Sequence, residues 1–127
     1  MAAGPGATVL IVDDDASIRK VARLRLEQEG FRVIVAQNGE EGLGLAKSGA
    51  PDVILLDIKM PGMDGREVLR RLKVSSDTQH IPVILLTVIG SHDELSSSIG
   101  PGYEFHLSKP YNPDMLLEAI RSVLKKK

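Results

Sequence analysis

The chain has 127 residues, of which 43% are hydrophobic and 26% are charged, and its formal net charge is −1. This composition predicts a single globular domain, and the near-zero net charge gives no reason to expect direct binding to nucleic acid. The absence of cysteine excludes disulfides and thiolate chemistry and fits a reducing compartment, so we expect a cytoplasmic location. No apolar run approaches the length of a membrane span, and we expect no membrane partner.

The chain begins with a short segment that differs from the rest. Residues 1–7 are mostly glycine and alanine, without the basic and apolar parts of a secretory signal. We expect them to form a flexible lead. Regular alternation of strand and helix patterns occupies residues 8–125, which we expect to form one domain.

Five apolar runs predict the strands of a sheet. They are rich in valine, isoleucine and leucine and cover residues 8–12, 31–36, 53–56, 81–86 and 103–107. Several of these runs are nearly continuous, and that pattern is typical of parallel strands buried on both faces.

Helical patterns follow each strand, at residues 16–29, 39–48, 65–74, 90–99 and 113–124. The last pattern begins with Asn112 as the predicted N-cap and Pro113 at the first helical position. The second is weakened by Gly42 and Gly44. The fourth contains three consecutive serines and few apolar residues, so we expect a short or mobile helix there. The alternation predicts an α/β fold in which helices cover both faces of a parallel sheet.

Acidic side chains follow two of the predicted strands. Asp13 and Asp14 follow the first strand, and Asp57 follows the third. Because the carboxyl ends of parallel strands meet at one edge, these carboxylates come together if the two strands are neighbours. Carboxylates packed together repel unless a cation neutralises them, and Mg²⁺ prefers oxygen ligands, so we interpret the three as a metal site. The alternative is a cluster of helix-capping acids, which is the role we favour for Asp15.

A hydroxyl and an ammonium complete this edge. Thr87 follows the fourth strand, and Lys109 follows the fifth. Together with the acids, they predict a phosphoryl site in which Asp57 is the nucleophile and forms an aspartyl phosphate. Mg²⁺ and Lys109 would offset the charge of the transferring group, and Thr87 would donate a hydrogen bond to it.

On these residues the chain resembles the receiver domains of two-component response regulators. The resemblance covers residues 8–124 and rests, with the spacing between them, on Val12-Asp13-Asp14, Asp57, Met60-Pro61, Asp64-Gly65, Thr87 and Lys109-Pro110. It implies a flavodoxin-like, doubly wound sheet of five parallel strands in the order 2-1-3-4-5, flanked by five helices. It also implies a cis peptide between Lys109 and Pro110.

The resemblance further implies a reaction and its partners. Asp57 would accept a phosphoryl group from a phosphohistidine on a sensor histidine kinase or a phosphotransfer protein. Mg²⁺ would be held by Asp14, Asp57 and the backbone carbonyl of Lys59, with Asp13 acting through water. Such a domain is a signalling phosphoacceptor that catalyses its own phosphotransfer and dephosphorylation, and it is not an enzyme in the usual sense.

The family's switch couples the threonine to an aromatic residue in strand five. That position falls on His106 here. Because a protonated imidazole resists burial, one hypothesis is a switch that is sensitive to pH; the alternative is that His106 only packs at the surface. The switch is implied to act at the face formed by helix four, strand five and helix five, which would bind a downstream protein or a second copy.

Three departures from the family pattern bear on the lifetime of the phosphate. Val88 and Ile89, next to Thr87, are larger or more apolar than is usual, and Lys59 is long. We expect a crowded, apolar entrance to hinder attack by water and to lengthen the lifetime of the phosphate.

Three other functions compete with this one. A constitutive interaction module that does not use phosphate stays open. An aspartyl-phosphate hydrolase is disfavoured because Lys59 stands where those enzymes place a second acid. A redox flavodoxin is disfavoured because no phosphate-cradling loop follows the first strand.

Overall fold

The computed structural model of the protein describes residues 6–87 and 102–125. These residues form one parallel sheet with the strand order β2-β1-β3-β4-β5. The strands are β1 Thr8–Val12, β2 Arg32–Ala36, β3 Val53–Asp57, β4 Val83–Thr87 and β5 Phe105–Ser108, and the helices are α1 Ala16–Gln28, α2 Gly39–Ser48, α3 Gly65–Val74 and α5 Pro113–Lys125. The predicted α/β class and the strand order are thereby confirmed. The predicted helix over 90–99 and residues 1–5 of the predicted lead lie outside the described residues.

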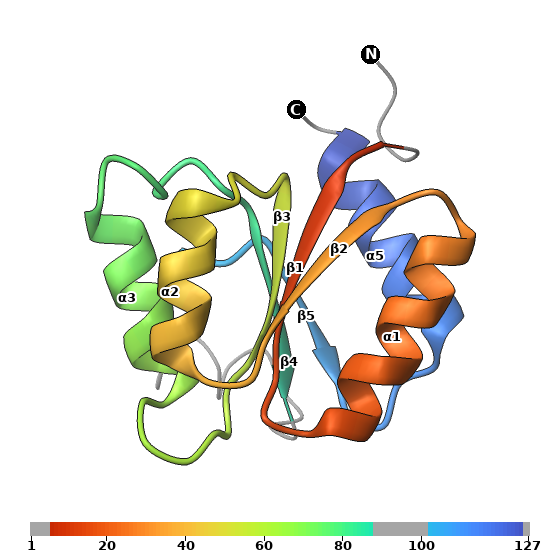
Figure 1. The fold of residues 1–127 in the computed structure, drawn as a ribbon, viewed down its shortest axis with the longest axis horizontal. Helices are drawn as coiled ribbons and strands as arrows, with labels where there is room; N and C mark the ends of the chain where they lie inside the picture. The colour runs from red at the N-terminus through yellow and green to blue at the C-terminus, as the bar shows by residue number, and fades with distance from the viewer. Residues whose placement is uncertain (1–5, 88–101, 126–127) are drawn as a thin grey trace.

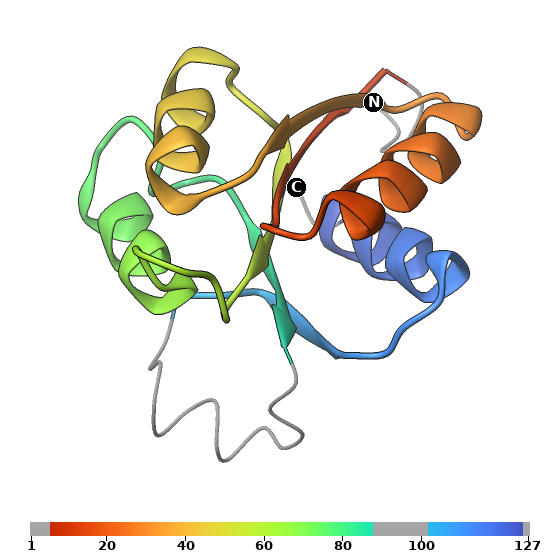
Figure 2. The same cartoon turned by 60° about the horizontal axis from the view of Figure 1, so that its bottom comes forward.

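The molecule has three layers, with the sheet in the middle (Figure 1). Helices α1 and α5 cover one face of the sheet, and α2 and α3 cover the other. Figure 2, which looks along the sheet from below, shows the same division into two helical layers. In the central strand β3, the side chains of Ile54, Leu55 and Leu56 are all 0% exposed. Burial on both faces explains why the strands have continuous apolar runs rather than alternating ones.

Helix α2 forms despite its two internal glycines. Two side chains cap its N-terminus. The Asn38 side chain accepts from the Glu41 N–H at 2.8 Å, and the Glu41 carboxylate accepts from the Gln37 N–H at 2.8 Å. A Cβ atom on Gly42 would lie 2.9 Å from Cγ2 of Val12, whereas one on Gly44 would have nothing within 4 Å. Gly42 therefore permits a close approach of α2 to the sheet.

The predicted starts of strands four and five were wrong by two residues. Residues 81–86 were expected as a strand, but the Ile81 N–H donates to the Thr78 carbonyl at 3.0 Å and so belongs to the preceding turn. Pro82 has no N–H to give to the ladder, so β4 begins at Val83. Strand β5 begins at Phe105 rather than at residue 103.

Smaller differences occur elsewhere in the secondary structure. Helix α1 ends at Gln28, one residue before its predicted end, and β2 begins one residue later than predicted, at Arg32. At the other end of the chain, the Asn112 side chain accepts from the Met115 N–H at 2.9 Å, as its predicted capping role requires.

Within the two described ranges, no helix has the length and apolar character that crossing a bilayer demands.

Candidate functional site

The register of the sheet brings the predicted site residues to one edge. Val12 of β1 lies opposite Leu56 of β3, so Asp13 and Asp57 follow at the same level. Ser108 of β5 lies opposite Thr87 of β4, and Lys109 comes next. The predicted site residues thus lie at the carboxyl ends of four adjacent strands or directly after them, as expected for a parallel sheet.

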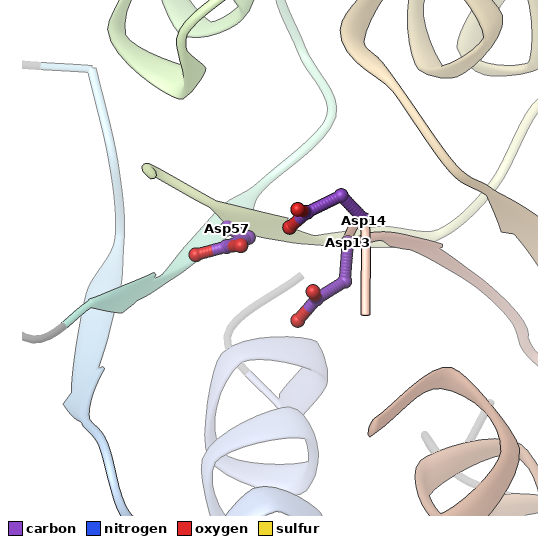
Figure 3. Close-up of side chains that lie close together, drawn as sticks. All are labelled: Asp13, Asp14 and Asp57. Atoms are coloured by element: carbon purple, nitrogen blue, oxygen red, sulfur yellow. The ribbon is translucent and has the colours of Figure 1, made fainter. Parts of the chain in front are cut away.

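Three carboxylates gather at this edge (Figure 3). Asp13, Asp14 and Asp57 can each offer one oxygen such that all three atoms lie within 4.8 Å of one another. Asp13 is 0% exposed and Asp57 is 2% exposed, while Asp14 is exposed to solvent. The Asp13 carboxylate points to the side of the sheet that α1 and α5 cover, and the Asp14 carboxylate diverges from it. The predicted clustering of the three acids is confirmed.

One ammonium group faces these acids. The Lys109 Nζ lies 3.1 Å from Oδ1 of Asp57 and 3.5 Å from Oδ2 of Asp13. The Lys109 backbone N–H donates to the carbonyl of Thr87 at 2.6 Å, which ties the end of β5 to the end of β4. The peptide between Lys109 and Pro110 is cis, as predicted. Among residues 6–87 and 102–125, Lys109 is the one cation paired with this cluster, through Asp57 and Asp13.

Burial and a neighbouring acid perturb the ionisation of Asp57. Burial raises the pKa of the Asp57 carboxyl from 3.8 to about 6, and the Asp13 carboxylate adds to that rise. The nearby Lys109 ammonium opposes it only in part. The ionised form of Asp57 is therefore destabilised in the folded protein unless further positive charge is supplied.

The donor set fits a hard divalent cation. Oδ1 of Asp13 accepts from the Asp15 N–H at 2.9 Å. Oδ2 of Asp13 is buried, and no residue in the described ranges gives it a hydrogen bond. Its one ion pair within those ranges is the long contact of 3.5 Å with the Lys109 ammonium. A buried carboxylate oxygen without a hydrogen bond is unfavourable, and coordination to a cation or to its bound water would satisfy it. Mg²⁺ prefers oxygen ligands, and the clustered carboxylates supply them.

The loop after β3 is held close to the site by α3. The Gly65 N–H donates to the Ile58 carbonyl at 2.9 Å, and a Cβ on Gly65 would lie 2.6 Å from the Cα of Ile58. Asp64 caps α3 by accepting from the Arg66 N–H at 2.7 Å. Lys59 lies on this loop with its side chain exposed.

The two residues predicted to form the switch lie on neighbouring strands. Thr87 is 1% exposed at the end of β4. His106 lies opposite Leu85 and is therefore two residue pairs further from the edge than Thr87 and Ser108. The His106 ring is half-buried, with its centroid 6.2 Å from that of Tyr103 in an edge-on arrangement.

Two further residues named by the sequence cannot be placed. Val88 and Ile89, on which the predicted lifetime of the phosphate depends, lie outside the described residues. That expectation therefore stays a prediction.

Helix α1 contributes a contact that the sequence analysis missed. The Arg19 guanidinium donates to the backbone carbonyl of Asp13 at 2.7 Å, which helps to fix the backbone below the acids. Asp15 has the predicted capping role, since its carboxylate accepts from the N–H groups of Ser17 at 2.8 Å and Ile18 at 3.3 Å. Arg19 lies one helical turn after that cap, and this spacing could have indicated that its side chain lies near the start of α1.

Comparisons with known proteins agree with this geometry. Residues 9–121 match the family described as the response regulator receiver domain. Among curated proteins, the chain is 41% identical over 118 residues to a probable transcriptional regulator, ycf27, of Guillardia theta. It is 36% identical over 121 residues to the phosphate regulon transcriptional regulatory protein PhoB of Pseudomonas aeruginosa. These matches cover 93% and 95% of this chain but 45% and 53% of those proteins, so the chain spans about half their length.

Solved structures give the same result. The chemotaxis response regulator CheY4 of Vibrio cholerae superposes with a TM-score of 0.87 at 34% identity, covering 93% of this chain and 98% of that one. A CheY-like receiver domain protein from Methanospirillum hungatei superposes with a TM-score of 0.86 at 32% identity, with 95% of both chains covered. The strand order, the acidic edge with its lysine, and these matches have one common explanation: the chain belongs to the response regulator receiver domain family.

Proposed function

We propose that Asp57 accepts a phosphoryl group from a phosphohistidine of a sensor histidine kinase or a phosphotransfer protein, with Mg²⁺ bound at Asp13, Asp14 and Asp57. The observation that carries this proposal is the placement of Asp57. Its carboxylate is 2% exposed at the tip of a rigid strand, 3.1 Å from the Lys109 ammonium and within a cluster of three carboxylates.

Each residue of this edge has its own role in the proposed phosphoryl transfer. An oxygen of Asp57 forms the new bond to phosphorus while the bond from phosphorus to the donor's imidazole nitrogen breaks, and the electron pair of that bond stays on the imidazole. The Lys109 ammonium pairs with the phosphoryl oxygens, and the Thr87 hydroxyl donates to one of them. When bound, Mg²⁺ offsets negative charge on the transferring group. Asp14, Asp57 and the Lys59 carbonyl are its proposed ligands, with Asp13 acting through water.

The consequence of phosphorylation is proposed to be a switch. Contact of Thr87 with the phosphoryl group would favour an inward position of the His106 ring, and the two states would differ at the face formed by helix four, β5 and α5. Phe105, which is 45% exposed on β5, offers apolar surface to a downstream protein or to a second copy of the chain at this face.

The output is proposed to pass through another protein segment or partner. The relatives named as transcriptional regulators are about twice as long as this chain, and the net charge of −1 gives no reason to expect that this domain itself binds nucleic acid. A cytoplasmic location, which the cysteine-free composition suggested, remains a prediction. A phosphate-independent interaction module is the second candidate, and the buried acid, hydroxyl and ammonium weigh against it.

Intact-mass measurement after incubation with acetyl phosphate tests the proposal. The wild-type chain should gain one phosphoryl group in the presence of Mg²⁺ and none with a chelator present. The Asp57→Asn variant should gain none in either condition. A Mg²⁺-dependent adduct on the variant would move the acceptor to another residue. Absence of an adduct on the wild type, together with absence of beryllofluoride binding, would favour the phosphate-independent module.

A further inference from the structure

Tyr111 combines an apolar setting with a polar atom that has no partner. It lies two residues after Lys109, and its ring packs against the apolar cluster between the sheet and helices α1 and α5. Its hydroxyl is buried, and no hydrogen-bond partner for it exists among residues 6–87 and 102–125. A buried hydroxyl without a partner is unfavourable, and in folded proteins such groups are rare enough to need an explanation.

A second buried polar atom without a hydrogen bond lies on the same side of the sheet. It is Oδ2 of Asp13, whose carboxylate points toward the layer of α1 and α5 (Figure 3). The Lys109 ammonium lies 3.5 Å from this oxygen. Lys109 and Tyr111 line the same groove, which has a volume of about 490 Å³ and runs along the start of α1. One of the two atoms is a hydroxyl that can donate, and the other is a carboxylate oxygen that can accept.

The setting of Tyr111 also determines the protonation state of its phenol. Burial raises the pKa of the Tyr111 phenol, and the carboxylates of Asp13, Asp57 and Asp15 raise it further. The phenol therefore keeps its proton near neutral pH and is available as a hydrogen-bond donor.

We propose that the Tyr111 hydroxyl donates to one water that in turn donates to Oδ2 of Asp13, and that this bridge orients the carboxylate for the divalent cation. A carboxylate oxygen has a second lone pair, which remains for the cation or its bound water. Oδ1 of Asp13 is already fixed by the Asp15 N–H, so a donor at Oδ2 would fix the second oxygen as well. Tyr111 is in this view a positioning residue that acts through Asp13. The inference rests on the proposed function, because it assumes that Asp13, Asp14 and Asp57 bind a cation.

This role predicts effects that a purely structural role would not produce. Tyr111→Phe keeps the ring and its packing and removes only the hydroxyl. Because that hydroxyl has no partner among the described residues, the denaturant midpoint in the presence of a chelator should stay the same or rise. The affinity for Mg²⁺ should nevertheless fall about tenfold, as is typical when a residue that orients a metal ligand is removed.

The test is a titration of the full chain with Mg²⁺, followed by the NMR shifts of backbone amides. Wild type, Tyr111→Phe and Tyr103→Phe are compared. Tyr103→Phe is the matched control, because it removes the hydroxyl of the other tyrosine, which packs on the side of the sheet that α2 and α3 cover. The proposal expects weaker binding in Tyr111→Phe and wild-type binding in Tyr103→Phe.

A double-mutant cycle tests whether the effect passes through Asp13. In the Asp13→Asn background, Tyr111→Phe should change the Mg²⁺ affinity by less than twofold, because the carboxylate that it orients is gone. An undiminished effect in that background would overturn the proposed route.

The outcomes separate this inference from the proposed function. If the wild type binds Mg²⁺ and Tyr111→Phe binds it equally well, only the role of Tyr111 is overturned. If Tyr111→Phe lowers the denaturant midpoint in chelator and leaves the affinity unchanged, the hydroxyl is structural and the inference is again overturned. If the wild type itself does not bind Mg²⁺, the proposed function fails and the inference fails with it.

Discussion

Strand β3 contains two regions of opposite energetic character within five residues. Ile54, Leu55 and Leu56 are 0% exposed among apolar neighbours from both helical layers. The next residue, Asp57, is 2% exposed beside another buried acid, and its pKa is raised to about 6. The apolar part of β3 therefore supplies stability that offsets the unfavourable burial of a reactive carboxylate at the end of the same strand.

The largest expected effect concerns the apolar part of β3. Leu55→Ala should lower the free energy of unfolding by about 3–4 kcal/mol, because it removes a fully buried side chain and leaves a cavity. The matched control is Leu24→Ala on α1, whose side chain is 58% exposed and whose loss should change stability by about 0.5 kcal/mol or less. Urea unfolding followed by circular dichroism measures both. Similar losses in the two variants would contradict the contrast between interior and surface.

The second prediction concerns the carboxyl end of β3 and has the opposite sign. Asp57→Asn should raise the free energy of unfolding of the metal-free protein by about 1–3 kcal/mol at pH 7, since it removes a buried charge whose pKa is raised from 3.8 to about 6. Lys109 keeps its ion pair with Asp13 in this variant. Denaturant unfolding in EDTA measures the change, and a loss of stability would contradict it.

The pH dependence of that difference sharpens the second prediction. A raised folded-state pKa of an acid means that the folded protein binds the proton more tightly than the unfolded chain. The unfavourable contribution of Asp57 is therefore absent below about pH 4, grows as the pH rises from about 4 to 6, and is complete above that range. The stability gap between Asp57→Asn and wild type should follow this course, and a gap that does not change with pH would argue against burial of the charge as its cause.

The third and smallest prediction concerns the close contact between α2 and β1 at Gly42. Gly42→Ala should lower stability by about 1 kcal/mol, because the new Cβ would lie 2.9 Å from Val12. On the same helix, Gly44→Ala meets nothing within 4 Å and should raise stability by about 0.5–1 kcal/mol through helix propensity. Thermal unfolding of the two variants checks the signs, and equal gains would show that α2 does not need its close approach.

Much of the fold follows from patterns in the sequence. The apolar runs located the strands because burial on both faces leaves a local record in composition. The acids after β1 and β3 were placed together correctly because parallel strands present their carboxyl ends at one edge. The capping roles of Asp15 and Asn112 were equally readable, since a cap is a contact between near neighbours.

Other features depend on contacts that the apolar periodicity of the sequence does not record. The start of β4 was misplaced because the turn that ends at Ile81 uses the N–H that a strand would need. The contact of Arg19 with the Asp13 carbonyl and the buried hydroxyl of Tyr111 result from the packing of α1 and the end of β5 around the site. The first two contacts are between near neighbours in the chain, but the periodicity that locates strands and helices does not record them. The burial of the Tyr111 hydroxyl depends on how the surrounding elements pack.

The central claim is that a divalent cation relieves the unfavourable charge at the end of β3. Its most direct test is the free energy of unfolding of wild type and Asp57→Asn, measured with EDTA and with increasing Mg²⁺. The account predicts that Mg²⁺ stabilises the wild type progressively, by about 2.7 kcal/mol at one hundred times its dissociation constant, and that Asp57→Asn, more stable in EDTA, gains much less. If Mg²⁺ stabilised both proteins equally, or neither, the account would be contradicted.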